Sequence, residues 1–280
     1  MSEVTALDRR ALDQHPLPPI VDGDKETKGR ILILAGSREV PGAALLAATA
    51  AMRAGAGKLK ISTVESVAVA LGVAMPEAMV VGIENAVDTR PLIEAASVIA
   101  IGPGLGTHAW GRALLDAALG AGKPLVIDAD GLNLLVGTGE QLPADTILTP
   151  HPGEAARLLG IDARAVQRDR YAAAAALAQR FGAVVVLKGA GTIVAAPGQT
   201  PCVIDAGNPG MAVGGMGDLL TGVVAALRAQ GLPAFDAARC GALLHAVAGD
   251  IAALDGGQRG LLPSDLLDCI RRLSNPPAAS

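Results

Sequence analysis

The stretch Gly207-Asn-Pro-Gly-Met-Ala-Val-Gly-Gly-Met-Gly-Asp-Leu-Leu-Thr-Gly222 places several glycines and one acid where a helix is expected to begin. Its glycines can adopt backbone angles closed to other residues, so consecutive N–H groups can converge on an anion. The dipole of a helix that starts near Asp218 adds partial positive charge. An ordinary helix N-terminus is the alternative, because Asp and Gly are favoured there for capping alone. The phosphate-binding interpretation assigns an anion hole to Gly214, Gly215, Met216 and Gly217.

Asp218 is the acid of this stretch, and its position raises a chemical question. A carboxylate beside an anion site costs electrostatic energy unless it has a role, such as taking a proton from a nucleophilic hydroxyl. We therefore predict that Asp218 is a catalytic base. A Walker-type loop, Gly-x-x-x-x-Gly-Lys-Ser/Thr, does not occur in the sequence, so the phosphate site is of a different kind.

The composition favours one large α/β domain over two smaller ones. The chain has 280 residues, of which 51% are hydrophobic and 18% charged, and it is long enough to bury a substantial core. Only 1% of the residues are aromatic, so Ala, Val, Leu and Ile must build that core and helices should pack closely on a sheet. A net charge of −4 without a basic cluster argues against a nucleic-acid partner.

The cysteines and the N-terminus bear on the expected location. Cys202, Cys240 and Cys269 are widely separated and show no C-x-x-C spacing, so neither zinc nor a disulfide framework is indicated. The first ten residues lack the basic start and apolar run of a signal peptide, and no uninterrupted apolar segment is expected to span a bilayer. We expect a cytoplasmic protein with no membrane partner.

Apolar runs alternate with helical segments along most of the chain, which predicts a mostly parallel central sheet with helices on both faces. An antiparallel hairpin around Pro197-Gly198 is expected at the edge of the sheet. Residues 1–28 are expected to form an irregular arm, residues 29–274 a single catalytic domain, and residues 275–280 a disordered tail. The expected strands lie at Ile31–Ala35, Leu59–Thr63, Met79–Ile83, Val98–Ile101, Leu125–Asp128, Ile147–Thr149, Val184–Lys188, Thr192–Ala196 and Pro201–Ile204.

Two loops that follow strands could bind phosphate or metal, because ligands of open parallel sheets bind beyond the carboxyl ends of the strands. Gly102-Pro-Gly-Leu-Gly106 suits a phosphate or a close dinucleotide backbone, although an ordinary glycine-rich turn has the same composition. Asp128-Ala-Asp130 places two carboxylates at a strand end, as suits a hydrated magnesium ion. A cap on the next helix is the alternative for Asp130.

Two further loops carry charged groups. In Thr149-Pro-His151-Pro-Gly-Glu154, two prolines fix the backbone around a histidine; alternatively, His151 is a surface residue and Glu154 only favours the helix N-terminus. In Lys188-Gly-Ala-Gly-Thr192, an ammonium, backbone amides and a hydroxyl could face a nucleotide phosphate. A plain β-turn would use the same glycines.

Together these loops, in this order and spacing, resemble the ADP-dependent NAD(P)H-hydrate dehydratases, a group within the ribokinase-like superfamily. The resemblance covers nearly the whole chain. It rests on Lys28–Ser37, Pro41–Ala43, Ile101–Gly106, Asp128–Asn133, Leu148–Glu154, Leu187–Thr192 and Asn208–Asp218. One departure is Met216, where many members have Thr or Ser; it loses a hydroxyl but leaves the backbone donors.

The resemblance implies roles for residues at the matching positions. Ala43, Gly106, His151 and Asp218 would contact the hydrated dinucleotide, and Glu154 and Asp128 would face Mg²⁺. Related kinases have Asn-x-x-Glu where this chain has His151-x-x-Glu154, which implies a changed substrate side. The adenine nucleotide would be held by Lys188, Gly189, Ala190, Gly191, Thr192 and Gly217.

The resemblance also implies an activity: conversion of hydrated NADH or NADPH (NADHX or NADPHX, the S epimer) to the dihydronicotinamide, with ADP as phosphoryl donor and AMP and phosphate as products. A homotetramer would be expected, and an epimerase for the hydrate would be a separate chain. Two other functions stay open. One is a small-molecule kinase acting on a hydroxymethyl or sugar hydroxyl, and the other is a nucleotide-sensing module without turnover, which would have no use for the acid at Asp218.

Overall fold

The computed structural model describes residues 4–14, 17, 28–138 and 142–275, and its centre is a ten-stranded sheet. The strand order is β1-β10-β9-β8-β7-β6-β5-β2-β3-β4. Strand β9 runs antiparallel to β8 and β10, and the remaining pairs are parallel. The strands are β1 (Thr5–Leu7), β2 (Arg30–Leu34), β3 (Lys58–Val64), β4 (Met79–Ile83), β5 (Val98–Ile101), β6 (Leu125–Ile127), β7 (Ile147–Leu148), β8 (Val184–Leu187), β9 (Thr192–Ala195) and β10 (Cys202–Ile204).

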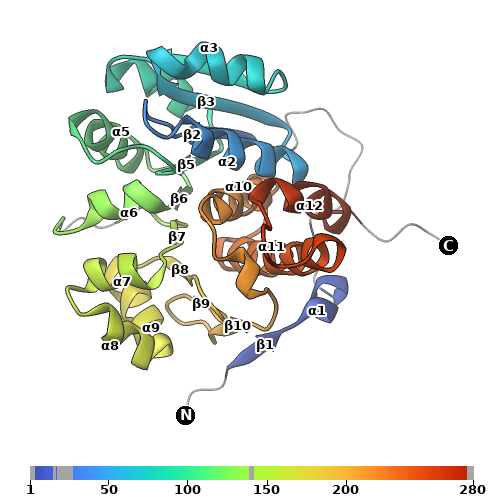
Figure 1. Cartoon of the computed structure of the whole chain (residues 1–280). Coiled ribbons are helices and arrows are strands. Elements are labelled where there is room, and N and C mark those ends of the chain that lie inside the picture. Colours follow the sequence, from blue (N-terminus) through green and yellow to red (C-terminus); the bar gives the residue numbers. More distant parts are fainter. Residues whose placement is uncertain (1–3, 15–16, 18–27, 139–141, 276–280) are drawn as a thin grey trace.

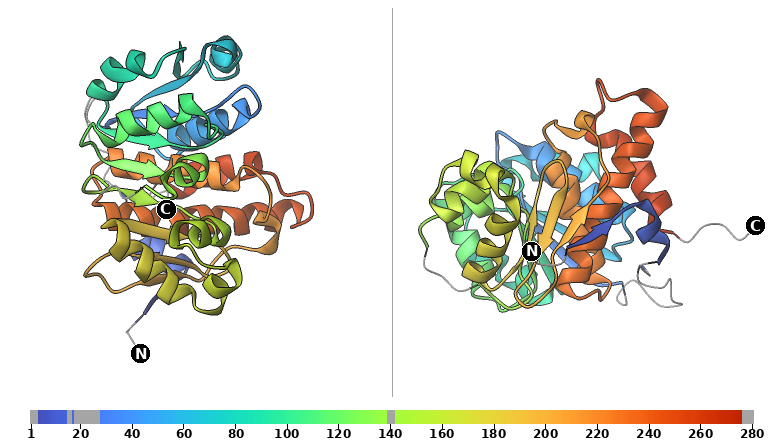
Figure 2. Two further views of the ribbon diagram at one scale, coloured as in Figure 1. Left: turned by 90° about the vertical axis from the view of Figure 1, so that its left-hand side faces the viewer. Right: turned by 90° about the horizontal axis from the view of Figure 1, so that it is seen from below.

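Helices cover both faces of the sheet, as the alternating pattern predicts. One layer, on the left in Figure 1, contains α4 (Arg90–Ala95), α5 (Ala109–Leu119), α6 (Ala129–Leu135), α7 (Pro152–Leu159), α8 (Ala163–Arg168) and α9 (Arg170–Phe181). The other contains α2 (Pro41–Arg53), α3 (Glu65–Ala74), α10 (Met216–Ala229), α11 (Ala234–Gly256) and α12 (Leu267–Leu273). Figure 2 shows the sheet between the two layers from two further sides.

The period-two geometry of a strand explains why the central strands are continuously apolar. Successive side chains point to opposite faces, so a strand covered on both faces needs apolar residues at every position. In β2, Ile31 and Ile33 belong to the core under α2, α10 and α11, whereas Leu32 and Leu34 belong to the core under α5, α6 and α9. The two cores lie on opposite faces of one sheet.

Small residues allow helices to approach closely, as the scarcity of aromatic residues predicts. A Cβ atom at Gly222 of α10 would lie 2.0 Å from the carbonyl oxygen of Ala47 in α2. Ala44, Ala47, Ala48 and Ala51 of α2 are also fully buried. The close contact between α2 and α10 fixes the helix whose first turn carries Asp218.

The N-terminal segment differs from the irregular arm expected from its prolines. Thr5–Leu7 forms β1, which pairs in parallel with Cys202–Ile204 of β10, and Arg9–Gln14 forms the short helix α1. The local composition gave no sign of this strand because its pairing partner lies about two hundred residues later. Residues 18–27 and the expected tail at 276–280 lie outside the described residues.

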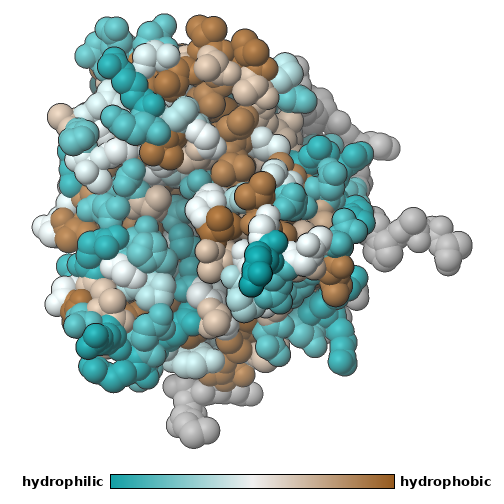
Figure 3. Space-filling view, in the orientation of Figure 1, coloured by the Kyte–Doolittle hydropathy of each residue, from teal (hydrophilic) through white to brown (hydrophobic). Residues whose placement is uncertain are grey.

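Two apolar features need separate explanations. Helix α11 is long and apolar enough to cross a membrane by length and composition, although Asp236, Arg239 and Asp250 interrupt its apolar residues, and 72% of its apolar window is buried inside the protein. Packing in the core accounts for its composition. Helix α3, by contrast, leaves Val69 and Val73 each 79% exposed, and Figure 3 shows hydrophobic surface over this part of the molecule.

Candidate active site

The carboxyl ends of β6, β7 and β8 bring three sequence-distant loops together. These strands are neighbours in the sheet, so the segments that follow them, at Asp128, His151 and Lys188, leave the sheet at the same edge. A backbone hydrogen bond from the N–H of Lys188 to the carbonyl oxygen of Pro150 (2.8 Å) joins the last two loops. The N-terminus of α10 completes the cluster.

A buried ion pair lies at the centre of this cluster. Lys188 Nζ is 2.6 Å from Asp128 Oδ1 and 4.0 Å from Glu154 Oε2, and the Asp128 side chain is only 1% exposed. Thr221 Oγ1 donates to Asp128 Oδ2 over 2.9 Å, so both carboxylate oxygens have partners. Burial by itself lowers the pKa of Lys188, but Asp128 and Glu154 raise it above its usual value. A buried charge is tolerated only when paired in this way, so Lys188 stays protonated.

The glycine-rich loop lies against this pair and begins α10 as expected, two residues before Asp218. Gly215 is the N-cap, with a φ of 94° and no side-chain cap, so the first amides of the helix stay available for a ligand. A Cβ atom at Gly217 would lie 3.1 Å from Lys188 Nζ and 3.4 Å from Asp128 Oδ2. The absence of a side chain at Gly217 therefore lets a ligand approach amides and an ammonium together.

Asp218 and Glu154 have raised pKa values. Burial and then the charge of Asp128 raise the pKa of Asp218, against the opposing effect of Lys188, to about 7. Burial likewise raises the pKa of Glu154 to about 7, again against the effect of Lys188. A carboxylate with a pKa near 7 is a much better proton acceptor at neutral pH than an ordinary aspartate, so Asp218 has the properties of a general base.

Asp130 connects this centre to the glycine loop after β5. Its Oδ2 accepts a hydrogen bond from the N–H of Gly106 (2.8 Å), and its Oδ1 accepts from Asn133 Nδ2 (3.4 Å). The capping alternative is therefore wrong for Asp130, and Asp128, the N-cap of α6, makes no side-chain cap either. Ala129, between the two acids, has a φ of 47°, a strained conformation for a residue with a Cβ atom.

The segments that carry Ala43 and Gly106 also come together. A Cβ atom at Gly104 would lie 3.1 Å from the Cβ of Ala43, so the start of α2 packs on the loop that ends at Gly106. Gly102, at the beginning of that loop, has a φ of 127°, and a Cβ there would lie 1.8 Å from the carbonyl oxygen of Asp128. Only glycine permits this approach between the loops after β5 and β6.

His151 has a structural role that the sequence did not reveal. Its Nδ1 accepts from the N–H of Gly153 (2.9 Å) and from the N–H of Glu154 (3.4 Å). Glu154 Oε2 in turn accepts from the N–H of His151 (2.7 Å), so the two residues form a reciprocal capping box. The exposed Nε2 edge is 3.5 Å from Glu154 Oε1, and half of the side chain is exposed. Burial and then Lys188 lower the pKa of His151, which favours the neutral ring. His151 is both a helix cap and a neutral group open to a ligand.

The segment Lys188–Thr192 forms the tight connection from β8 to β9. Thr192 Oγ1 donates to the carbonyl oxygen of Gly189 (3.0 Å), so its hydroxyl serves the turn. Arg170 of α9 stabilises the turn. Its guanidinium donates to the carbonyl oxygens of Leu187 (3.0 Å), Lys188 (3.2 Å) and Ala190. The ammonium of Lys188 is directed toward Asp128, so the turn amides and the ammonium serve different parts of the site.

Sequence reasoning missed three supporting residues. Thr221 lies three residues after Asp218 on the same helix face, so helical periodicity could have identified it. Arg170 gave no signal, because it reaches the turn after β8 from the preceding helix. His245 of α11 is buried and hydrogen-bonds to the backbone of Met216, in the glycine-rich loop that begins α10. Its Nε2 has no partner among the described residues, and burial lowers its pKa to about 4.

The residues expected to face magnesium do not by themselves form a metal site. Within the described ranges, no group of three or more His, Cys, Asp or Glu side chains is arranged to hold a metal ion. Asp128 already bonds to Lys188 and Thr221, and Glu154 accepts from His151. This arrangement fits a cation that arrives with substrate phosphates and keeps its own waters, the usual behaviour of Mg²⁺.

The fold and the loops at the sheet edge define the class of protein. A ribokinase-like superfamily protein of Enterococcus faecalis superposes with a TM-score of 0.88 at 29% identity, covering 98% of this chain and 97% of that one. Residues 31–272 match the family model of NAD(P)H-hydrate dehydratase, so the chain belongs to that family. The ADP/ATP-dependent NAD(P)H-hydrate dehydratase of Bacillus subtilis, co-crystallised with ATP/Mg²⁺, is 32% identical with a TM-score of 0.84, covering 96% and 97% of the two chains.

Curated relatives agree with the family and differ in length. The bifunctional NAD(P)H-hydrate repair enzyme Nnr of Coxiella burnetii is 45% identical over 96% of this chain and 53% of its own length. The enzyme of the same name from Escherichia coli is 44% identical over 90% of this chain and 48% of its length. The chain therefore spans about half the length of the curated relatives it matches.

Proposed function

We propose that this chain catalyses ADP-dependent dehydration of hydrated NADH or NADPH, giving the dihydronicotinamide, AMP and phosphate. The observation that carries the proposal is Asp218, whose pKa is raised to about 7 in the first turn of α10, beside the anion loop and the buried pair of Lys188 and Asp128. The family supports the substrate, since the matched family model is that of NAD(P)H-hydrate dehydratase.

In the proposed first step, Asp218 takes the proton of the hydroxyl on the hydrated nicotinamide ring. The hydroxyl oxygen then forms a bond to the terminal phosphorus of ADP, and the bond from that phosphorus to the bridging oxygen breaks, releasing AMP. The amides of Gly215–Gly217 and the ammonium of Lys188 are placed to offset the charge on the transferred phosphoryl group. Bound Mg²⁺, facing Asp128 and Glu154, would supply further neutralisation of phosphate charge.

In the second step, the ring nitrogen's lone pair expels the attached phosphate, which is a far better leaving group than hydroxide. Loss of a proton from the neighbouring ring carbon then restores the dihydronicotinamide. This chemistry explains why a phosphoryl donor is needed. His151 is proposed to contact the hydrate, because its half-exposed side chain lies beside Glu154, which is itself 4.0 Å from Lys188 of the buried pair. Ala43 and Gly106 are proposed to contact the same substrate.

The adenine nucleotide is proposed to bind at the turn after β8, on the opposite side of Asp128 from Gly106. The N–H of Gly189 donates to Thr192 Oγ1 within the turn (3.3 Å), so the backbone of Ala190 and Gly191 is proposed to face the nucleotide, and Arg170 holds the turn in place. Gly217 lies between this turn and Asp218. In this arrangement the two substrates approach Asp218 from opposite halves of the sheet.

One assay tests the proposal directly. The protein is mixed with hydrated NADH and ADP, and recovery of dihydronicotinamide absorbance is followed together with release of AMP and phosphate. Equal amounts of all three products are expected, and a parallel reaction with ATP measures the choice of donor. Accumulation of a stable phosphorylated product without phosphate release would contradict the proposal and indicate a small-molecule kinase.

Other properties of the protein also remain proposals. The relatives are named bifunctional, and we propose that epimerisation of the hydrate is supplied by sequence outside the part matched here. We propose a homo-oligomer, which light scattering of the purified chain would test. A cytoplasmic location is proposed as well, and it fits the three buried free cysteines.

A further inference from the structure

A pocket of about 530 Å³ lies on the other half of the sheet edge, beyond the carboxyl ends of β2, β3, β4 and β5. Its volume is in the range of sites for small molecules and large enough for a nucleoside monophosphate. Of the residues that line this pocket, only Gly106 is among the substrate contacts proposed above. Its lining includes Arg38, Glu39, Glu65, Glu84, Gly106 and Trp110.

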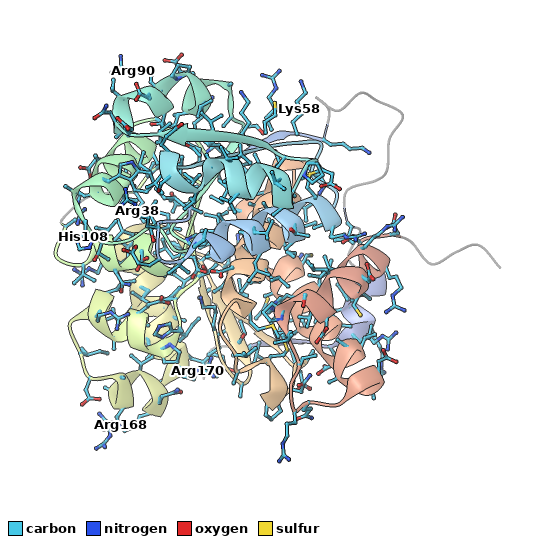
Figure 4. All side chains as sticks on the ribbon, turned by 45° about the horizontal axis from the view of Figure 1, so that its top comes forward. Arg38, Lys58, Arg90, His108, Arg168 and Arg170 are labelled. Atoms are coloured by element: carbon cyan, nitrogen blue, oxygen red, sulfur yellow. The ribbon has the colours of Figure 1, made fainter. Side chains whose placement is uncertain are left out.

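The pocket is continuous with the reaction centre through one residue. Gly106 lines the pocket, and its N–H donates to Asp130, whose charge raises the pKa of Asp218. The nucleotide turn after β8 lies on the other side of β6 in the strand order. In Figure 4, Arg38 and His108 of the pocket lie near one another, and Arg170 lies in another part of the molecule. A dinucleotide with its nicotinamide at Asp218 can therefore extend past Gly106 into the pocket.

The lining chemistry suits a nucleoside with a free ribose diol. Trp110 supplies a partly buried aromatic ring, and Arg38, whose Nε donates to Ser66 Oγ over 3.4 Å, makes no ion pair among the described residues. The carboxylates of Glu39, Glu65 and Glu84 are exposed and have no hydrogen-bond or ion-pair partner in the described part of the chain. Acids at strand ends accept hydrogen bonds from ribose hydroxyls in dinucleotide-binding sheets.

The charge of the pocket also bears on which dinucleotide fits. One guanidinium is enough to contact the pyrophosphate of a dinucleotide. A phosphate on the adenosine ribose would have to lie among three carboxylates, and like charges at short range are strongly disfavoured. A free 2′-hydroxyl, in contrast, donates to the same oxygens.

We propose that this pocket holds the adenosine half of hydrated NADH, with Glu65 and Glu84 accepting hydrogen bonds from the ribose hydroxyls, and that it disfavours the 2′-phosphate of hydrated NADPH. The inference rests on the proposed function and deepens it, because it places the remote half of the substrate and sets the choice between the two dinucleotides. Glu65 follows β3 directly, and Glu84 follows β4, so both carboxylates are held at strand ends.

Steady-state kinetics test whether the protein prefers hydrated NADH to hydrated NADPH. With ADP saturating, kcat/KM for hydrated NADH is expected to exceed that for hydrated NADPH by roughly tenfold or more, and the ratio should fall as salt is raised. The double variant Glu65→Gln, Glu84→Gln should bring the ratio to within roughly threefold of one, mainly by improving hydrated NADPH. Glu77→Gln, an exposed glutamate outside the pocket, is the matched control and should leave the ratio unchanged.

Binding provides a readout that does not need turnover. Calorimetry of the ADP-saturated protein with unhydrated NADH and NADPH should show the same preference in the wild type and its loss in the double variant. Equal affinities in the wild type, or a preference that survives the double substitution, would overturn the pocket assignment. If the binding preference holds but neither hydrate is turned over, the proposed function fails and the pocket assignment stands.

Discussion

The two halves of the sheet edge use charge in opposite ways. At the ends of β6, β7 and β8, Asp128 and Glu154 are buried and bridged by Lys188. At the ends of β2, β3 and β4, Glu39, Glu65 and Glu84 are exposed and have no partners among the described residues. Buried paired charges are fixed in position before a ligand binds, whereas exposed carboxylates keep their hydrogen-bonding capacity for a ligand. The first arrangement suits chemistry and the second suits recognition.

The largest effect on turnover is expected at Asp218, the proposed general base. Asp218→Asn should lower kcat by roughly 100- to 10,000-fold, the usual contribution of a general base, while ADP affinity stays close to wild type. Single-turnover kinetics and calorimetry measure the two quantities. Asp255→Asn, at the exposed end of α11, is the matched control and should have wild-type activity. Wild-type turnover in Asp218→Asn would remove this residue from the mechanism.

The buried pair should also matter for stability, unlike the exposed acids. Lys188→Met leaves the carboxylate of Asp128 buried without its cation and should lower the free energy of unfolding by about 3–5 kcal/mol. Adding Asp128→Asn should restore part of that loss. Glu84→Gln should change stability by less than about 0.5 kcal/mol, as expected for a surface position. Chemical denaturation measures the free energy of unfolding of each variant. Equal values for Lys188→Met and Glu84→Gln would show that the buried pair contributes no more to stability than the exposed acids.

His245, buried behind the glycine-rich loop that begins α10, should make the free energy of unfolding depend on pH. Its pKa is lowered from 6.5 to about 4 in the folded protein, so the unfolded chain binds a proton that the folded chain does not. The resulting loss of stability is absent above about pH 6.5, grows as the pH falls, and amounts to about 3 kcal/mol near pH 4. Subtracting the unfolding free energy of His245→Gln isolates this contribution from the carboxylates. A difference between the proteins that does not change between pH 7 and 4.5 would refute the assignment.

Activity should follow the ionisation of Asp218. Because its pKa is raised to about 7, kcat should fall by about tenfold per pH unit below that value. Glu154 also has a pKa of about 7, so the two acids must be separated experimentally. Glu154→Gln keeps the capping box, since Gln serves at that position, and should retain the acid limb of the profile if Asp218 is the base. If Glu154→Gln instead loses the fall in kcat at low pH, that fall reports the ionisation of Glu154.

The smallest effect on activity is expected at His151, in the loop that follows β7. His151→Ala should raise KM for the hydrate several-fold and lower stability by about 1 kcal/mol, because it removes both a proposed substrate contact and the N-cap of α7. His151→Asn should restore the cap and show the substrate effect alone. If calorimetry shows that His151→Ala abolishes ADP binding while circular dichroism shows an intact fold, the histidine belongs to the nucleotide site.

The sequence by itself determined the alternating architecture and most of the chemical groups. Period-two and helical patterns are local, so the strands Met79–Ile83 and Val98–Ile101 were placed at their observed bounds. The glycines and the acid of Gly214–Asp218 also follow from local backbone chemistry, and α10 begins within two residues of the expected position.

Only the tertiary structure decided which of these groups meet. Lys188 was predicted to face a nucleotide phosphate, and the structure adds that its ammonium pairs with Asp128, sixty residues earlier in the sequence. Asp130 was considered for a hydrated magnesium ion or, alternatively, for a helix cap, and its carboxylate accepts a hydrogen bond from the N–H of Gly106. The strand at Thr5–Leu7 depends on a partner strand about two hundred residues later in the sequence. Such contacts depend on strand order and on the position of α10 over the sheet, and these are set by packing between distant segments that no local pattern encodes.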